Sequence, residues 1–238
     1  MDQSVALQEF EQINNLRAQV YRMLGSLYFT ELSMDQIRSL SEQDYRVFAD
    51  LDPELAQGAQ EMERALRHPH SGLREDLAVD YAHIFLAAGS TKDEERGVPY
   101  ESVYTSEERL LMGPARQAVY RVMLKEGVLP DESLHVPEDH LSFECEFMAH
   151  MAAKSVDALK ADDVAEARRC VEVQQNFRTE HLANWIGDLC AAVVKSGRTR
   201  FYRGVALVTK AFVRIDEELL GECAAVLDGG QGSQGDTE

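Results

Sequence analysis

Apolar residues recur at intervals of three and four positions along most of the chain, which is the spacing of an amphipathic helix. In residues 4–29 the apolar stripe consists of Leu7, Phe10, Ile13, Leu16, Val20, Leu24, Leu27 and Tyr28. Comparable runs cover 33–40, 52–66, 71–89, 106–112, 114–127, 137–152, 163–197 and 198–222. Patterns typical of strands are nearly absent. The sequence therefore predicts an all-α fold, a single compact helical bundle of about ten helices with no sheet.

Capping signals mark several of the predicted helix ends. Ser33 stands where an N-cap is needed, and Gln36 completes a capping box with it. Asp52 is placed to cap the next helix, with Pro53 at its first position. Residues 1–227 are expected to form one helical domain, and the small, polar residues 228–238 a disordered tail.

The helical pattern lapses over residues 89–106, the longest predicted internal loop. Its first part, "STKDEERG", has the composition of a disordered segment. Its second part, "VPYESVY", offers two tyrosines and valines that can pack against the bundle. Because long loops in compact domains are often functional, we expect this second part to be anchored.

Charge narrows the possible partners. Lys and Arg number 24 against 42 for Asp and Glu, a formal net charge of −18. Such a surface repels nucleic acid and anionic lipid and attracts a basic partner. The N-terminus is acidic and lacks a signal-peptide core, and no run of about 18 apolar residues occurs, so we expect a cytoplasmic protein without membrane insertion. The four cysteines lie far apart, which favours buried, reduced thiols over a zinc site or disulfides.

One helical stretch carries polar residues on its apolar face. In "VPEDHLSFECEFMAHM", Pro137 fits the first position of a helix. His140 and Glu144 then fall one turn apart within the apolar arc, whereas Asp139 falls on the opposite, solvated face. Burying an unpaired charge costs several kcal/mol, so the two inward groups need partners or a cleft.

Three interpretations of these polar residues stay open at this point. The first is a structural contact that pins the preceding linker to the bundle. The second is a cleft floored by Phe and Met, in which Asp139, His140 and Glu144 meet a basic peptide. The third is a metal or hydrolytic site, although no second ligand pair stands at the required spacing. Motifs of phosphate loops and of nucleophilic enzymes are missing from the sequence.

Five segments together resemble a known family. They are "DYAHIFLAAG", a loop with "PYESVY", "PEDHLSFECEFMAHM", "FRTEHLANWIGDL" and "FYRGVALVTKAFVRID". In order and spacing they are similar to the TorD/DmsD/NarJ family of redox-enzyme maturation chaperones, over about residues 15–220. The most specific parts are the Tyr-x-Ser-x-Tyr loop and the Pro-x-Asp-His-x-x-x-Glu motif.

This resemblance implies an all-helical cytoplasmic chaperone that catalyses no reaction and holds no cofactor or metal. Its partners would be the twin-arginine signal peptide and the apoenzyme of a molybdopterin oxidoreductase. The chaperone would assist cofactor insertion and delay export by the Tat translocon. A NarJ-like assembly factor for a nitrate-reductase subunit that is not exported is the alternative within the family. A monomer is the expected state, with a domain-swapped dimer as the alternative.

The resemblance also implies which residues form the peptide-binding region. Carried over position by position, these are Tyr81, Phe85, Tyr100, Ser102, Pro137, Asp139, His140 and Glu144.

Overall fold

The computed structural model describes residues 3–48, 51–67, 71–86 and 96–229. The described helices are α1 (Gln3–Phe29), α2 (Met34–Ser41), η1 (Tyr45–Phe48), α3 (Pro53–Leu66), α4 (Leu73–Phe85), α5 (Glu101–Thr105), α6 (Pro114–Glu126), η2 (Glu132–Leu134), α7 (Leu141–Lys160), α8 (Val164–Phe177), η3 (Arg178–Leu182), α9 (Ile186–Ser196) and α10 (Arg200–Gly229). Within these ranges no strand occurs, apart from one isolated bridge. The all-α prediction and the expected number of helices are confirmed. Of the segments 90–97 and 228–238, for which disorder was predicted, residues 90–95 and 230–238 lie outside the described residues. Asp228 and Gly229 still belong to α10, so the helix ends two residues later than predicted.

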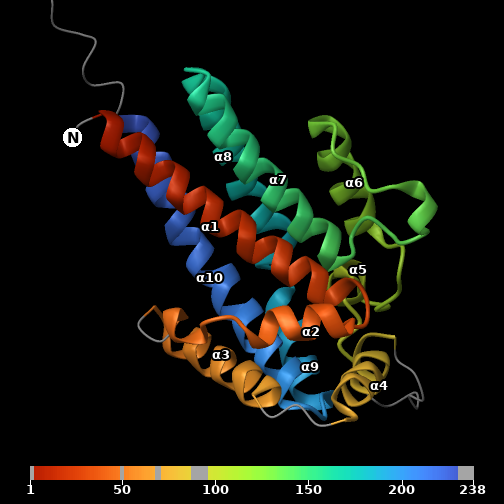
Figure 1. Ribbon diagram of the computed structural model, residues 1–238. Coiled ribbons are helices and arrows are strands. Elements are labelled where there is room, and N and C mark those ends of the chain that lie inside the picture. The colour runs from red at the N-terminus through yellow and green to blue at the C-terminus, as the bar shows by residue number, and fades with distance from the viewer. Residues whose placement is uncertain (1–2, 49–50, 68–70, 87–95, 230–238) are drawn as a thin grey trace, which may run out of the picture.

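Long helices form the body of the bundle, and shorter ones gather at one end. α1 packs along α7, α7 along α8, and α10 against α3, α9 and α1. Figure 1 shows α2, α3, α4 and α9 together at the lower end, while α5 and α6 lie to one side. No helix in the described part of the chain has both the length and the apolar composition that crossing a bilayer requires.

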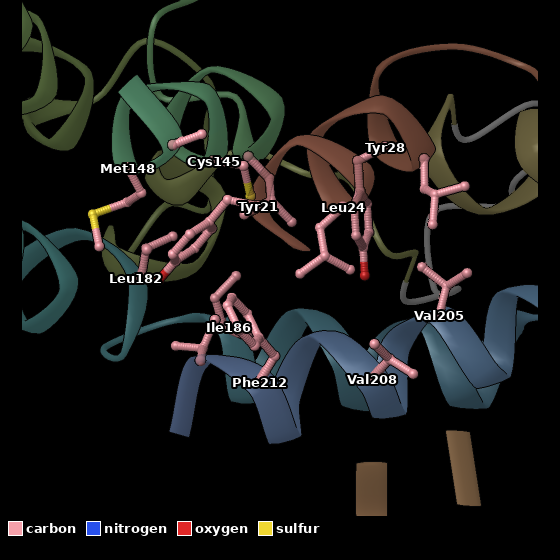
Figure 2. Packing of buried hydrophobic residues seen from close by; sticks show 14 of the residues in the cluster. Tyr21, Leu24, Tyr28, Cys145, Met148, Leu182, Ile186, Val205, Val208 and Phe212 are labelled. Carbon is pink, nitrogen blue, oxygen red and sulfur yellow. The ribbon is translucent and has the colours of Figure 1, made fainter. Parts of the chain in front are cut away.

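Side chains from several helices meet in one apolar core. Tyr21 and Leu24 of α1 face Val205, Val208 and Phe212 of α10 (Figure 2). The ring of Tyr21 meets that of Phe212 edge to face, with centroids 4.9 Å apart. The four cysteines are buried and none is in a disulfide, as the sequence predicted.

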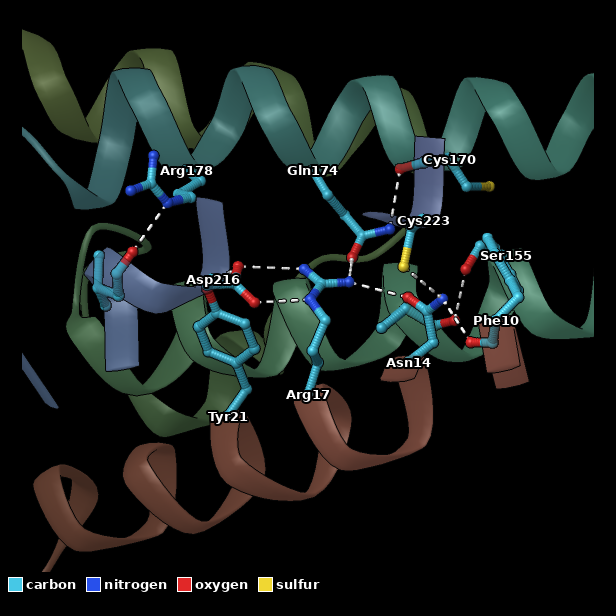
Figure 3. A network of polar contacts seen from close by, with 12 residues as sticks. Phe10, Asn14, Arg17, Tyr21, Ser155, Cys170, Gln174, Arg178, Asp216 and Cys223 are labelled. Carbon is cyan, nitrogen blue, oxygen red and sulfur yellow. Dashed lines mark hydrogen bonds and ion pairs between the residues drawn. The ribbon is translucent and has the colours of Figure 1, made fainter. Parts of the chain in front are cut away.

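A fully buried polar network crosses this core, and the spacing of apolar residues does not predict it (Figure 3). The Arg17 guanidinium on α1 donates to both carboxylate oxygens of Asp216 on α10, at 2.6 and 3.1 Å. Tyr21 donates to the same carboxylate at 2.7 Å. Arg17 also donates to Asn14 and to Gln174 on α8, each at 2.8 Å. The network therefore joins three helices through one ion pair that water does not reach.

The crossing of α3 and α10 depends on two glycines. A Cβ atom on Gly58 would stand 2.8 Å from the carbonyl oxygen of Gly204. A Cβ atom on Gly204 would stand 2.6 Å from the carbonyl oxygen of Gly58 and 2.8 Å from the amide nitrogen of Met62. The two backbones are thus closer than any residue with a side chain allows.

Most predicted helix ends agree with the structure. Ser33 and Gln36 form the capping box of α2, and Asp52 accepts the amides of Glu54 and Leu55 at the start of α3. The predicted helix over 106–112 is wrong, because these residues form turns and positive φ angles at Arg109 (52°) and Met112 (67°) break the helical path.

Candidate functional site

The loop before α5 is anchored to the start of α7, as predicted for residues 98–104. Tyr100 and His140 form the isolated antiparallel bridge. The amide of Glu101 donates to the carbonyl of Asp139 at 3.0 Å, and the amide of Leu141 donates to the carbonyl of Pro99 at 2.9 Å. These backbone bonds bring together the two sequence motifs that carry the family resemblance.

The first turn of α7 differs from the prediction. The helix begins at Leu141, so Pro137 is not at its first position. His140 is the N-cap instead, because its Nδ1 accepts the amide of Ser142 at 3.1 Å. Asp139 precedes the cap within a turn and is buried, not solvated. Residues 137–140 are not helical, so helical spacing does not apply to Asp139, and the predicted solvated position is wrong.

Asp139 is held by Ser102 of α5. Its Oδ2 accepts the amide of Ser102 at 2.9 Å and also the Ser102 hydroxyl. The other oxygen, Oδ1, is buried and has no hydrogen-bond partner. Oδ2 of Asp139 therefore connects α5 to the residues before α7, whereas Oδ1 can still accept a hydrogen bond.

His140 lies in an aromatic surrounding. Its ring is 4.8 Å from that of Tyr100, 6.0 Å from Phe143 and 6.2 Å from Phe29. Burial lowers the pKa of His140 to about 4. The imidazole is therefore neutral at pH 7, in agreement with its role as a hydrogen-bond acceptor at Nδ1. Phe29 is 37% exposed, so the aromatic group reaches the surface.

Glu144 points into the same region and lacks hydrogen bonds. Its side chain is fully buried, and neither carboxyl oxygen has a partner. Burial first, and then the nearby carboxylates of Glu101 and Asp139, raise the pKa of Glu144 well above its usual value. The neutral acid is accordingly the favoured form in the folded protein.

Sequence reasoning missed Glu101, which lies at the centre of this polar cluster. Its Oε2 is 3.0 Å from Nδ1 of His181, and its Oε1 accepts from Asn184 at 3.2 Å. His181 and Asn184 lie 80 and 83 positions after Glu101 in the sequence. His181 belongs to η3, a single π-helical turn, and such turns often occur at functional sites. The irregular turn directly after α8 is the structural reason that His181 reaches α5.

Tyr81 and Phe85 lie on α4, in an aromatic group rather than in the polar cluster. The hydroxyl of Tyr81 donates to the carbonyl of Tyr28 at 3.0 Å. Phe85 packs against the rings of Tyr28, Tyr81 and Tyr202, with centroids 5.0–5.4 Å apart. Both side chains are buried.

The cleft that the second interpretation of these polar residues requires is closed in this structure. Asp139, Ser102 and Glu144 have no exposed surface, and His140 is 5% exposed. Tyr100 is only partly buried. A ligand could touch the carboxyl groups only after α5 moves away from α7. Among the described residues, no cluster of three or more His, Cys, Asp or Glu could hold a metal ion.

Glu144→Gln is expected to raise the free energy of unfolding relative to wild type, and to raise it more at pH 8 than at pH 5. The pKa of Glu144 is higher folded than unfolded, so above pH 4.5 the unfolded chain loses a proton that the folded chain keeps, and stability falls as pH rises. Glu144→Gln has no such proton and keeps the shape. The stability difference between variant and wild type should therefore grow with pH, by at most about 1.4 kcal/mol per pH unit. Urea unfolding at both pH values measures it, and an equal difference at pH 5 and pH 8 would contradict a neutral Glu144.

Comparison with known proteins agrees with the features assembled above. Residues 49–191 match the family model described as nitrate reductase delta subunit. The chain belongs to this family. It is 28% identical over 222 residues to the chaperone protein TorD of Vibrio cholerae serotype O1 strain O395, covering 91% of this chain and 97% of that protein.

Further TorD chaperones show the same extent of similarity. That of Vibrio parahaemolyticus is 27% identical over 224 residues, covering 91% of this chain and all of the relative. That of Shewanella loihica is 28% identical over 219 residues, covering 87% and 94%. The resemblance to TorD-type chaperones is confirmed, and the chain belongs among chaperones rather than enzymes. The interpretation as a hydrolytic site is therefore wrong.

Proposed function

We propose that this protein is a cytoplasmic maturation chaperone that binds the twin-arginine signal peptide and the apo-form of a molybdopterin oxidoreductase. Binding would keep the apoenzyme from the Tat translocon until its cofactor has been inserted. The peptide-binding region would comprise the α5 loop, the start of α7 and the aromatic residues beside them. Membership of the family and the TorD relatives support the chaperone part of the proposal.

One observation carries the assignment of the peptide site. Three buried carboxyl oxygens, Oδ1 of Asp139 and both of Glu144, lack a hydrogen-bond donor. A guanidinium group offers five donors in a fixed planar arrangement and pairs especially well with carboxylates. An arginine of the signal peptide would satisfy Oδ1 of Asp139 and the carbonyl oxygen of the neutral Glu144, and the formal charge of −18 would attract it.

Entry of that arginine requires movement of α5. This helix has only five residues, and Ser102 with a few backbone bonds connects it to α7. Exchange of the Ser102–Asp139 contact for an arginine–Asp139 contact replaces a neutral donor with a charged one, which is the stronger bond. Movements of a loop or short segment on binding are common in regulatory complexes. Tyr100 and Phe29 would then contact the peptide beside the opened site.

Asp139→Asn is expected to weaken binding of a synthetic twin-arginine peptide by about 10- to 100-fold, the value of a hydrogen bond to a charged group. Asparagine can still accept the Ser102 amide, so the fold should persist, as circular dichroism would verify. Glu146→Gln, which removes an exposed carboxylate of α7, is the matched control and should change affinity little. Calorimetric titration gives both affinities. Equal affinity of folded Asp139→Asn and wild type would contradict the site.

The match to the nitrate reductase delta subunit family favours a second candidate, assembly of a nitrate-reductase subunit that is not exported. The two candidates differ in the client's N-terminus. Affinity purification with the wild-type chain, followed by mass spectrometry, identifies the client. A client without paired arginines supports the second candidate and argues against the first.

A further inference from the structure

The short helix α5 is attached to the rest of the protein on two sides. On one side, its backbone and Ser102 bond to the residues that precede α7. On the other side, it contacts the corner between α8 and α9, which consists of η3 and residues 183–185. Glu101 and Tyr104 make these second contacts, and their spacing of three positions places them on the same side of α5. Two separate sets of contacts therefore hold α5 in the position that closes the candidate site.

The contacts with the corner combine a buried carboxylate and a pair of aromatic rings. Both oxygens of Glu101 have a partner there, because Oε2 lies 3.0 Å from Nδ1 of His181 and Oε1 accepts from Asn184 at 3.2 Å. The ring of Tyr104 stacks on that of Trp185, with centroids 5.5 Å apart and planes inclined by 28°. Hydrogen bonds to an ionised acceptor are stronger than those between neutral groups. The corner thus contributes substantially to holding α5.

The corner itself is irregular, and its own hydrogen bonds fix the side chains that it presents to α5. η3 is a single π-helical turn, and the backbone leaves helical geometry at Trp185, with φ of −140°. The Trp185 indole donates to the carbonyl of His181. The Asn184 amide donates to the carbonyl of Glu180 at 2.7 Å as well as to Glu101. His181, Asn184 and Trp185 therefore meet α5 as one prearranged surface.

The carboxyl groups beneath α5 oppose the closed position. Oδ1 of Asp139 and both oxygens of Glu144 are buried without a hydrogen-bond donor, although water would hydrate them if α5 opened. Closure also brings acidic groups together, since Glu101 and Asp139 contribute to the raised pKa of Glu144. The contacts between Glu101 and the corner therefore offset an unfavourable arrangement in the site that α5 covers.

We infer that α5 is an autoinhibitory segment of the candidate peptide site, held closed by the contacts of Glu101 and Tyr104 with the α8–α9 corner. This inference rests on the proposed function and concerns the regulation of that same site. In the closed position, the Ser102 hydroxyl bonds to Asp139, the acceptor that an arginine of the peptide would use. α5 and the peptide thus exclude each other, and the corner sets the fraction of molecules that can bind.

This arrangement predicts the sign of a change in affinity. When only a fraction of the molecules is open, the measured dissociation constant equals the intrinsic constant divided by that fraction. Weakening a contact at the corner raises the open fraction and therefore the affinity, even when the substitution adds or removes no charge. If α5 instead stayed on the corner in the bound complex, the same substitution would weaken binding.

Asn184→Ala is expected to increase the affinity for a synthetic twin-arginine peptide by about five- to tenfold, because it removes a hydrogen bond to the Glu101 carboxylate. Asn184 is exposed, so the variant should fold, as circular dichroism would verify. Thr179→Ala is the matched control, since Thr179 is exposed on η3 and donates to the carbonyl of Gln175 at 2.9 Å, as Asn184 does to that of Glu180. Calorimetric titration should give this control the affinity of wild type.

Hydrogen exchange of the free protein tests the opening of α5 without any peptide. The amides of Glu101 and Leu141 donate across the closed junction at 3.0 and 2.9 Å, so their exchange with solvent requires α5 to open. In Asn184→Ala both amides should exchange about five- to tenfold faster than in wild type, the same factor as for the affinity. Thr179→Ala should leave both rates unchanged.

The two measurements separate this inference from the proposed function. Unchanged exchange of the Glu101 and Leu141 amides in Asn184→Ala would overturn the inference and leave the proposed function intact. Faster exchange with unchanged or weaker peptide binding would overturn it as well, because opening of α5 would then not limit binding. If neither wild type nor Asn184→Ala binds the peptide, the proposed function and the inference are both wrong.

Discussion

Replacing Asp216 with alanine should lower the free energy of unfolding by about 3–5 kcal/mol, the largest effect that we expect from one substitution. The change leaves the Arg17 guanidinium charged in a place that water does not reach, and it removes the acceptor of Tyr21 as well. Urea unfolding followed by circular dichroism measures the loss. For a chain of this size, the midpoint temperature of thermal unfolding should fall by about 10 °C.

The double variant Arg17→Met with Asp216→Leu is the informative control for the buried ion pair. It removes both charges and fills the space with apolar atoms, so much of the lost stability should return. Glu146→Gln disrupts the exposed pair with Arg22, whose side chains are 52% and 62% exposed, and should cost less than about 1 kcal/mol. A loss for Asp216→Ala as small as that for Glu146→Gln would contradict a dry ion pair in the core.

Replacing Gly204 with alanine should lower the free energy of unfolding by about 2–3 kcal/mol, because the added methyl overlaps backbone atoms of α3. The carbonyl oxygen of Gly58 and the amide of Met62 cannot rotate away as a side chain could, so α3 and α10 must separate. Chemical denaturation of the purified variant measures the loss.

Gly221→Ala is the matched control on the same helix. Its Cβ would meet no atom within 4 Å, and alanine favours helix over glycine by about 1 kcal/mol, so this change should stabilise the protein. Opposite signs for the two substitutions would establish that the crossing, and not the helix itself, requires glycine. Equal effects at both positions would contradict a close backbone approach.

The helical periodicity of the sequence was sufficient to predict the fold class and the number of helices. Local signals also placed the starts of α2 and α3, because Ser33 and Asp52 act within their own first turns. Local signals failed where a distant partner decides the conformation. α5 forms within a predicted loop, where Glu101 is held by His181, a residue 80 positions away.

For the candidate site, the sequence correctly singled out His140 and Glu144 as buried polar residues. It placed Asp139 on the solvated side, because the true start of α7 depends on the His140 side chain as a cap. Glu101 was missed, since nothing in its neighbourhood distinguishes it from the many other acidic residues. The spacing of apolar residues over 163–197 does not indicate the π-helical turn that brings His181 into contact with Glu101.

The carboxyl groups of Asp139 and Glu144, which lie between α5 and α7, are proposed to accept an arginine of a signal peptide. Titration of wild-type protein and Asp139→Asn with a twin-arginine peptide and a twin-lysine peptide tests this proposal most directly, since lysine cannot pair with a carboxylate in the bidentate manner of arginine. We predict that wild type prefers the arginine peptide by at least about tenfold and that Asp139→Asn abolishes most of this preference. Equal binding of the two peptides by wild type, or an undiminished preference in Asp139→Asn, would contradict the account.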